Sequence, residues 1–190
     1  KRRERALMVL GRLGPDAAAA VPDLVKALKG GDAKQRNEVL FVLGAIGPDK
    51  GARRLERLVA EVRASNARVR FVVIGYLDAQ HLPWQSDDAV LTVHGRYVSS
   101  DLPGLLDHYR VQLVAYPSAG PESFSLTLSE SWAAGRPVIV PPVGALAERV
   151  AGSGAGWVWS DGEWRSEAQM LARIVAIVAP AQLGALESAA

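Results

Sequence analysis

From about residue 37 onwards, short apolar runs alternate with stretches of helical periodicity, and the connections between them are short. This alternation limits the fold more than any other feature, because it is typical of a parallel sheet whose two faces are covered by helices. We therefore predict an α/β fold. The expected strands are Val39 to Leu43, Val69 to Gly75, Ala89 to His94, Val111 to Tyr116, Pro137 to Val140 and Gly156 to Trp159.

Apolar residues recur at helical spacing between these strands. Such stripes predict helices that pack on the sheet. The expected helices are Gly51 to Ser65, one around the stripe Leu102, Leu105, Leu106 and Tyr109, one opened by Ser123 or Ser125, a short one from Ala145 to Ala151 and a long closing one from Glu163 to Ala179.

Residues 1–36 differ from the rest of the chain. They hold nine Lys and Arg against four Asp and Glu, a net charge of +5, which leaves 13 against 16, or −3, for residues 37–190. Helical spacing on both sides of Gly14-Pro15 predicts a small α-helical hairpin. The segment Val9 to Asp16 recurs 33 residues later as Val42 to Asp49, a period typical of stacked helical repeats.

The second copy of this repeat is ambiguous. Residues 37–44 are compatible with the first helix of another repeat or with a buried strand. The continuous apolar run from Val39 to Leu43, ended by Gly44 and followed by a helix, favours the strand. We therefore divide the chain into a helical hairpin, residues 1–36, and an α/β domain, residues 37–190.

Composition excludes several classes of protein. The absence of Cys excludes disulfides and thiolate metal sites, and it fits a reducing cytoplasm. No run of about 18 uninterrupted apolar residues occurs, so no transmembrane segment is expected. His81, His94 and His108 lie in separate segments without ligand spacing, so we expect no metal. The basic end lacks aromatic residues and resembles a solvated helix face, so we expect no nucleic-acid partner.

A pair of carboxylates marks the loop after the strand at Val111 to Tyr116. Glu122 lies in a loop rich in Pro and Gly, and Glu130 follows eight residues later, about two turns into the next helix. A strand, a tight loop and a helix N-terminus together form an anion site, because the first N–H groups of a helix lack partners. The amides of Phe124, Ser125 and Leu126 are the expected phosphate ligands, and the carboxylates can accept hydrogen bonds from sugar hydroxyls.

The stretch from Glu122 to Gly144, with Gly135-Arg136-Pro137-Val138-Ile139-Val140 after the second Glu, resembles the E-x7-E region of GT-B type retaining glycosyltransferases. These enzymes are built from two Rossmann-like domains, and the C-terminal one binds the sugar nucleotide. The resemblance extends from about Asn37 to Ala179. It implies a Rossmann-like, nucleotide-sugar-binding domain over residues 37–190.

The resemblance also implies roles for individual residues. Glu122 would contact the donor sugar, and Glu130 would bind the ribose hydroxyls. The amides at Phe124, Ser125 and Leu126 would hold the diphosphate. Ser123 and Ser125 stand where the family usually has Gly. No metal or other cofactor is expected beside the donor.

Three further turns match segments of the same family. Gly44 to Gly51 resembles a G-R-x-x-x-x-K-G loop that neutralises the diphosphate, with Lys50 at the Lys and Ala45 where Arg is expected, so Arg96 or Arg136 is needed to supply the second charge. Gly95-Arg96-Tyr97 resembles the segment that meets the nucleotide base, and Gly144 resembles the Gly that faces the diphosphate. A solvated Lys50, a core or lid role for Tyr97 and a plain helix start at Gly144 remain alternatives.

Residues 1–36 resemble one unit of the short HEAT-like repeats related to phycobilisome lyases, which are protein-interaction scaffolds. One unit cannot bury its apolar face alone, so we expect it to pack on the α/β domain, on a second copy of the chain or on a partner protein. The family's separate acceptor domain does not fit in these residues. We therefore expect a donor-binding half that is inactive as a transferase by itself. The alternative is a non-catalytic interaction scaffold, or a recombined or engineered fusion of a HEAT-like repeat with a glycosyltransferase half.

Overall fold

The structure is a computed structural model that describes residues 38–47, 51–77, 80, 82–118, 120 and 124–179, with the backbone alone for 38–45. The predicted helical hairpin, Lys50 and Glu122 lie outside these residues.

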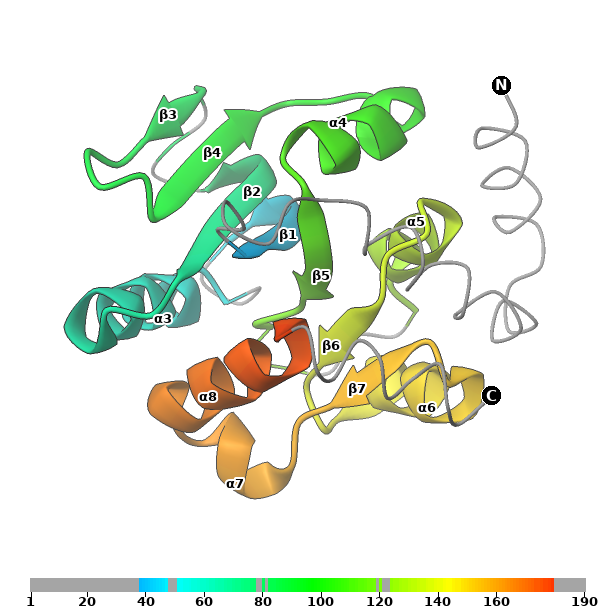
Figure 1. The fold of residues 1–190 in the computed structure, drawn as a ribbon. Helices are drawn as coiled ribbons and strands as arrows, with labels where there is room; N and C mark the ends of the chain where they lie inside the picture. Colours follow the sequence, from blue (N-terminus) through cyan, green and yellow to red (C-terminus); the bar gives the residue numbers. More distant parts are fainter. Residues whose placement is uncertain are drawn as a thin grey trace.

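Seven strands form one sheet in the order β3-β4-β2-β1-β5-β6-β7 (Figure 1). Every neighbouring pair is parallel except β3 with β4. The strands are β1 (Glu38–Ile46), β2 (Val69–Leu77), β3 (Trp84–Gln85), β4 (Leu91–Gly95), β5 (Val111–Ala115), β6 (Val138–Val140) and β7 (Gly156–Val158).

The six predicted strands are all present, and the ambiguous segment at 37–44 is a strand. This strand, β1, lies at the centre of the sheet, where it pairs with β2 from Glu38 to Ile46 and with β5 on its other side. The predicted turn from Gly44 is wrong, because β1 continues to Ile46 and places Gly44 opposite Gly75 of β2. The loop therefore begins at Gly47.

Two strand details differ from prediction. The fourth strand begins at Leu91 rather than Ala89, because Ala89 has a φ of 56° and its N–H donates to the carbonyl of Ser86 in a turn. The short antiparallel strand β3 was not predicted. It has only two residues and both are exposed, so the sequence shows neither a buried apolar run nor the alternation that predicts a strand.

Helices cover both faces of the sheet. Residues that alternate along β2 separate two apolar cores: Val72 and Ile74 face one, and Phe71 and Val73 face the other. The first core includes residues of α4 (Leu102–His108), α5 (Leu126–Ala133) and α6 (Gly144–Ser153). The second includes residues of α3 (Ala52–Ser65) and α8 (Glu167–Val178), with the short α7 (Asp161–Trp164) beside them.

The single closing helix predicted from Glu163 to Ala179 is wrong, because the segment forms two helices. Ser160 and Glu163 make a reciprocal capping box at the start of α7, and the Ser166 hydroxyl accepts a hydrogen bond from the Gln169 N–H at the start of α8. Two N-caps six residues apart therefore start two separate helices. Trp159 is buried, and its ring lies 5.3 Å from that of Trp164, so the two tryptophans pack together at α7.

Of the two serines predicted to open the third helix, the structure has the later one, Ser125. Ser125 is the N-cap of α5, so Glu130 is the fifth residue of the helix and lies in its second turn, not two turns in. Among the described helices, none combines the length and the apolar character needed to cross a membrane.

Candidate functional site

The carboxyl ends of β4, β1, β5 and β6 meet along one edge of the sheet, because these strands are parallel. In open α/β sheets this edge is where ligands bind, since the loops that follow the strands diverge there. The described parts of these loops are residues 96–98 after β4, 47 and 51 after β1, 116–118, 120 and 124–125 after β5, and 141–143 after β6.

Glu130 of α5 joins the loop after β4. The Ser99 hydroxyl donates a hydrogen bond of 2.9 Å to Oε1 of Glu130. The pKa of the Tyr97 hydroxyl is raised to about 12, mainly by burial and in addition by the charge of Glu130 and the hydrogen bond to it. Tyr97 and Glu130 were both predicted site residues, and the structure brings them together; Ser99 was not predicted.

Tyr97 is half-buried, with its body against the core beneath α4 and α5. Its hydroxyl is protonated at neutral pH, as for any tyrosine, so it presents a neutral donor to the carboxylate. Glu130 is therefore placed by two hydroxyl groups from another loop. Such an acidic side chain can also accept hydrogen bonds from a ligand, because each carboxylate oxygen has two lone pairs.

The amino end of α5 lacks the usual side-chain cap. Ser125 has φ 61° and ψ 92°, and its hydroxyl is hydrogen-bonded to that of Thr127 at 3.0 Å instead of to the helix backbone. The first N–H groups of the helix thus receive no cap from the N-cap side chain, which is the condition under which a helix start attracts an anion. Phe124 and Leu126, the other two predicted backbone ligands, are exposed.

Arg149 of α6 forms hydrogen bonds with the segment that opens α5. Its Nη1 donates to the carbonyl oxygens of Phe124 at 2.6 Å and Ser125 at 3.1 Å, and its Nη2 donates to the Ser129 hydroxyl at 2.8 Å. Its guanidinium also lies 4.6 Å from the centre of the Phe124 ring. Arg149 was not predicted as a site residue. The sequence indicates only that it belongs to α6, the helix that follows the loop after β6.

The two arginines considered as the second positive charge have different positions. Arg136 is buried, and its Nη2 donates to Asp107 Oδ1 at 2.5 Å. It precedes β6 and so lies at the opposite edge of the sheet, which makes it wrong as a ligand for this site. Arg96 follows β4 at the correct edge, is exposed, and lies over the ring of Tyr76 at 5.4 Å.

Positive φ values, and at Gly51 a close backbone contact, explain the glycines at this edge. A Cβ at Gly51, whose φ is 92°, would lie 2.0 Å from the carbonyl oxygen of Pro117, so the loops after β1 and β5 touch at a position open only to glycine. Gly95 and Gly144 also have positive φ values, 91° and 70°. Gly144 is the first residue of α6, so the helix start expected there is present.

Exposed apolar side chains border the site. Val98 follows β4, Phe124 and Leu126 open α5, and Val143 precedes α6; all four are exposed. They come from three different loops of one edge. Within the described part of the chain, no three His, Asp or Glu side chains gather closely enough to hold a metal ion.

Three solved structures share this fold. The chain is similar to Anabaena HepE in complex with UDP and glucose (18% identity, TM-score 0.58, covering 88% of this chain and 47% of that one). It is similar to the same protein in complex with UDP-glucose (20%, 0.57, 88% and 48%). It is also similar to an E. coli protein described as trehalose-6-phosphate bound with UDP-2-fluoro glucose (10%, 0.55, 88% and 44%). The chain thus spans about half the length of these proteins.

No curated protein matches the chain in sequence. The model of the family described as glycosyl transferases group 1 matches residues 36–177, which is more than half of the chain and includes every described strand. The parallel sheet with helices on both faces is the Rossmann-like arrangement of one half of a GT-B glycosyltransferase. The chain therefore belongs to the family of group 1 glycosyl transferases.

Proposed function

We propose that this chain is the donor-binding half of a retaining glycosyltransferase and that it binds a nucleoside diphosphate sugar at the carboxyl edge of its sheet. The observation that carries the proposal is the meeting of Tyr97, Ser99 and Glu130 beside the uncapped start of α5. The UDP, glucose and UDP-glucose in the HepE structures support a sugar nucleotide as the ligand class.

The nucleoside would bind between the loop after β4 and α5. Glu130 accepts hydrogen bonds from the ribose hydroxyls, which replace or join the bond from Ser99. The Tyr97 ring offers a face on which a base can stack, and its neutral hydroxyl keeps the carboxylate in place. The backbone at Gly95 and Arg96 borders the same space, because Gly95 ends β4.

The diphosphate would lie against the start of α5. The amides of Phe124, Ser125 and Leu126 supply donors there, and the helix dipole favours the negative charge. Arg96 and Lys50 supply the positive charges, since Arg136 is occupied by Asp107. Gly144 lets the backbone at the start of α6 approach the phosphates, because no Cβ is in the way.

The sugar would extend from the diphosphate toward Glu122, which precedes α5. Charge develops on the departing diphosphate as the glycosidic bond breaks, and donors already fixed in position stabilise that charge without reorganisation. In this proposal Lys50 and the start of α5 provide the stabilisation, and no metal ion takes part.

The acceptor would bind on a second domain. The exposed side chains of Val98, Phe124, Leu126 and Val143 form an apolar border that a facing domain would cover. Because the chain spans about half of its structural neighbours, we infer that it binds the donor alone but transfers sugar only with such a domain in place.

A thermal-shift screen with UDP, GDP, ADP and their sugar conjugates tests the proposal. A ligand at one hundred times its Kd stabilises the folded state by about 2.7 kcal/mol, so true binding raises the melting temperature measurably. Calorimetry should then show that Glu130→Ala lowers the affinity about tenfold or more, because hydrogen bonds to a charged group are lost.

Glu56→Ala is the matched control, because Glu56 is an exposed carboxylate on α3, on the other face of the sheet. It should leave nucleotide affinity unchanged. An absence of binding by all three nucleoside diphosphates and their conjugates, or equal losses in the two variants, would contradict the proposed function.

A further inference from the structure

A hollow lies at the opposite edge of the sheet from the proposed donor site. It has a volume of about 350 Å³. Arg70 is the second residue of β2, Thr92 the second of β4, and Arg110 directly precedes β5, so the hollow is at the amino ends of the strands. Its described lining consists of Arg70, Val72, Gln85, Thr92, His108, Tyr109 and Arg110.

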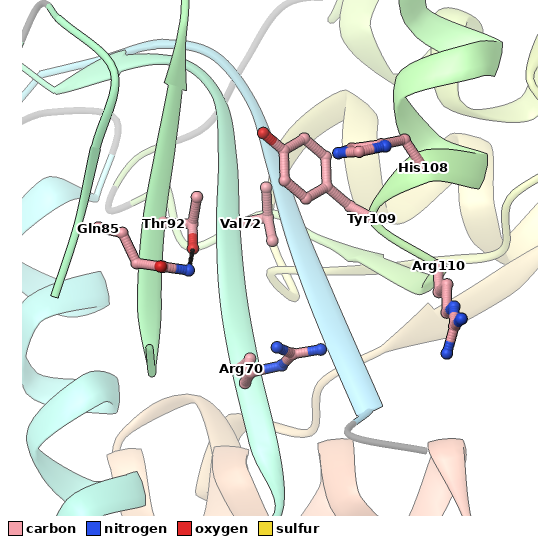
Figure 2. A pocket seen from close by; sticks show the side chains of 7 residues that line it. All are labelled: Arg70, Val72, Gln85, Thr92, His108, Tyr109 and Arg110. Atoms are coloured by element: carbon pink, nitrogen blue, oxygen red, sulfur yellow. Dashed lines mark hydrogen bonds between the residues drawn. The ribbon is translucent and has the colours of Figure 1, made fainter. Parts of the chain in front are cut away.

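The side chains surround the hollow from three directions. Figure 2 shows Gln85 and Thr92 on one side, Tyr109, His108 and Arg110 on the other, and Arg70 with Val72 between them. They lie on β2, β3 and β4 and at the end of α4. The hollow is therefore a product of the sheet order and of α4, which ends at His108.

The described side chains that line the hollow are basic or uncharged, and none is acidic. Two guanidinium groups and one imidazole face the hollow, and no carboxylate is among the described lining residues. Nε of Arg70 is buried without a hydrogen-bond partner, and neither Arg70 nor Arg110 makes an ion pair with the described residues. An unpaired buried donor on a charged group is costly, and an anion in the hollow would satisfy it.

The neutral groups are arranged to donate as well. Gln85 Nε2 donates to Thr92 Oγ1 at 2.9 Å, so the Thr92 hydroxyl has already accepted one bond and can direct its own proton elsewhere. Tyr109 is fixed by its hydroxyl, which lies 2.9 Å from Nδ1 of His94, and by an edge-to-face contact with the His108 ring at 4.8 Å. Its ring gives the hollow a rigid aromatic wall.

Arg110 occupies an unusual backbone position. It follows α4 with a φ of 55°, a left-handed conformation that normally favours glycine at the end of a helix. A long cationic side chain at this position keeps a guanidinium at the rim of the hollow.

We propose that this hollow binds a small phosphomonoester, with the phosphoryl group between Arg70 and Arg110 and the rest of the molecule against Tyr109. Guanidinium groups suit phosphate because their N–H groups form paired hydrogen bonds with its oxygens, and two of them balance a dianion. The volume exceeds what inorganic phosphate needs, which leaves room for a sugar-sized group. The site lies at the other end of the strands from the proposed donor site and does not depend on it.

Calorimetric titration of the full chain with glucose 6-phosphate, inorganic phosphate and glucose tests this assignment. We expect saturable binding of glucose 6-phosphate, weaker binding of inorganic phosphate and none of glucose. The ring signals of His108 in NMR spectra should shift during the first titration, because this residue lines the hollow. The absence of saturable binding by glucose 6-phosphate, or binding of glucose equal to it, would overturn the proposal.

Variants separate this site from the rest of the surface. Arg70→Gln and Arg110→Gln should each weaken binding of glucose 6-phosphate about tenfold or more. Arg110 is exposed, so its variant remains informative if Arg70→Gln does not fold. Arg68→Gln removes an exposed arginine outside this lining and should leave the affinity unchanged. Equal affinity in the wild type and in the folded variants would also overturn the assignment.

Two further measurements distinguish alternatives. UDP binding should be unchanged in Arg110→Gln, so that loss of one site can be told apart from loss of the other. Co-sedimentation with phosphatidylcholine vesicles that contain phosphatidic acid tests a lipid source of the same phosphomonoester. Binding to these vesicles without binding to glucose 6-phosphate would contradict the proposal that the ligand is a small soluble phosphomonoester.

Discussion

The Ser99 hydroxyl donates a hydrogen bond of 2.9 Å to Oε1 of Glu130, although 31 residues separate the two. Between them the chain passes through α4 and β5 before it returns at α5. The contact therefore joins the loops that follow two different strands of the same sheet edge. It fixes the acidic group to which we assign the ribose, before any ligand is present.

We predict that Ser99→Ala weakens nucleotide binding about fivefold. A single hydrogen bond contributes about 1 kcal/mol, and its loss leaves Glu130 less well positioned without removing it. Calorimetry with the best nucleotide of the screen measures the change. Ser100→Ala is the control, because the only bond of the Ser100 hydroxyl to a described residue goes to its neighbour Asp101. If both variants bind like the wild type, Ser99 does not help to place the carboxylate.

The ionisation of Tyr97 gives a second test. Its pKa in the folded protein is raised to about 12, above the value of about 10 for an unperturbed tyrosine. The stabilisation linked to this group is fully present below about pH 10 and is lost as the pH rises through 12, because the unfolded chain releases the proton first. Urea denaturation of wild type and Tyr97→Phe at pH 9 and pH 11.5 should show a loss of stability that is larger in the wild type.

Glu130→Gln should lower the pKa of Tyr97 only in part. Burial is the largest cause of the shift, and it remains in the variant, whereas the charge of Glu130 is removed. Tyrosinate absorbance measures the titration, with Tyr97→Phe used to identify the signal. A pKa that returns fully to the ordinary value of a tyrosine would mean that charge, rather than burial, controls this side chain.

The parallel strands of the sheet were predictable from local pattern, whereas the short exposed strand β3 was not. Central strands such as β5 are continuous apolar runs with turn residues on both sides, because both faces of the sheet are buried. The split between α7 and α8 was also present in the sequence, since Ser160 and Ser166 are each followed three residues later by Glu163 or Gln169. The long apolar periodicity from Leu171 onwards obscured these caps.

The contacts that complete the site were less accessible to prediction. Arg149 meets the Phe124 carbonyl across 25 residues, and only the packing of α6 beside α5 determines that distance. The same holds for Arg136, which was considered as the second positive charge of the site and instead donates to Asp107. Sequence pattern identifies which loops share an edge, but the choice of partner within that edge depends on tertiary geometry.

Arg149→Lys should destabilise the loop before α5 and weaken nucleotide binding. A lysine ammonium cannot reproduce the two directions in which Nη1 and Nη2 donate, so bonds to Phe124 and Ser129 are lost. We expect a decrease of about 1–2 kcal/mol in the free energy of unfolding. Hydrogen exchange at residues 124–129 should increase in the same variant. Unchanged exchange there would show that Arg149 does not hold the loop.

Gly51 should tolerate no side chain. In Gly51→Ala the new Cβ would lie 2.0 Å from the Pro117 carbonyl oxygen, and the backbone φ of 92° is itself unfavourable for alanine. One of the two loops must move, so we expect a loss of at least about 2 kcal/mol in stability together with weaker nucleotide binding. Gly104→Ala is the matched control in α4, where nothing lies within 4 Å of a Cβ. It should stabilise the protein by about 0.5–1 kcal/mol, because alanine favours the helix. Urea denaturation of the two variants measures both effects, and a Gly51→Ala protein as stable as the wild type would mean that the loops after β1 and β5 are not in contact.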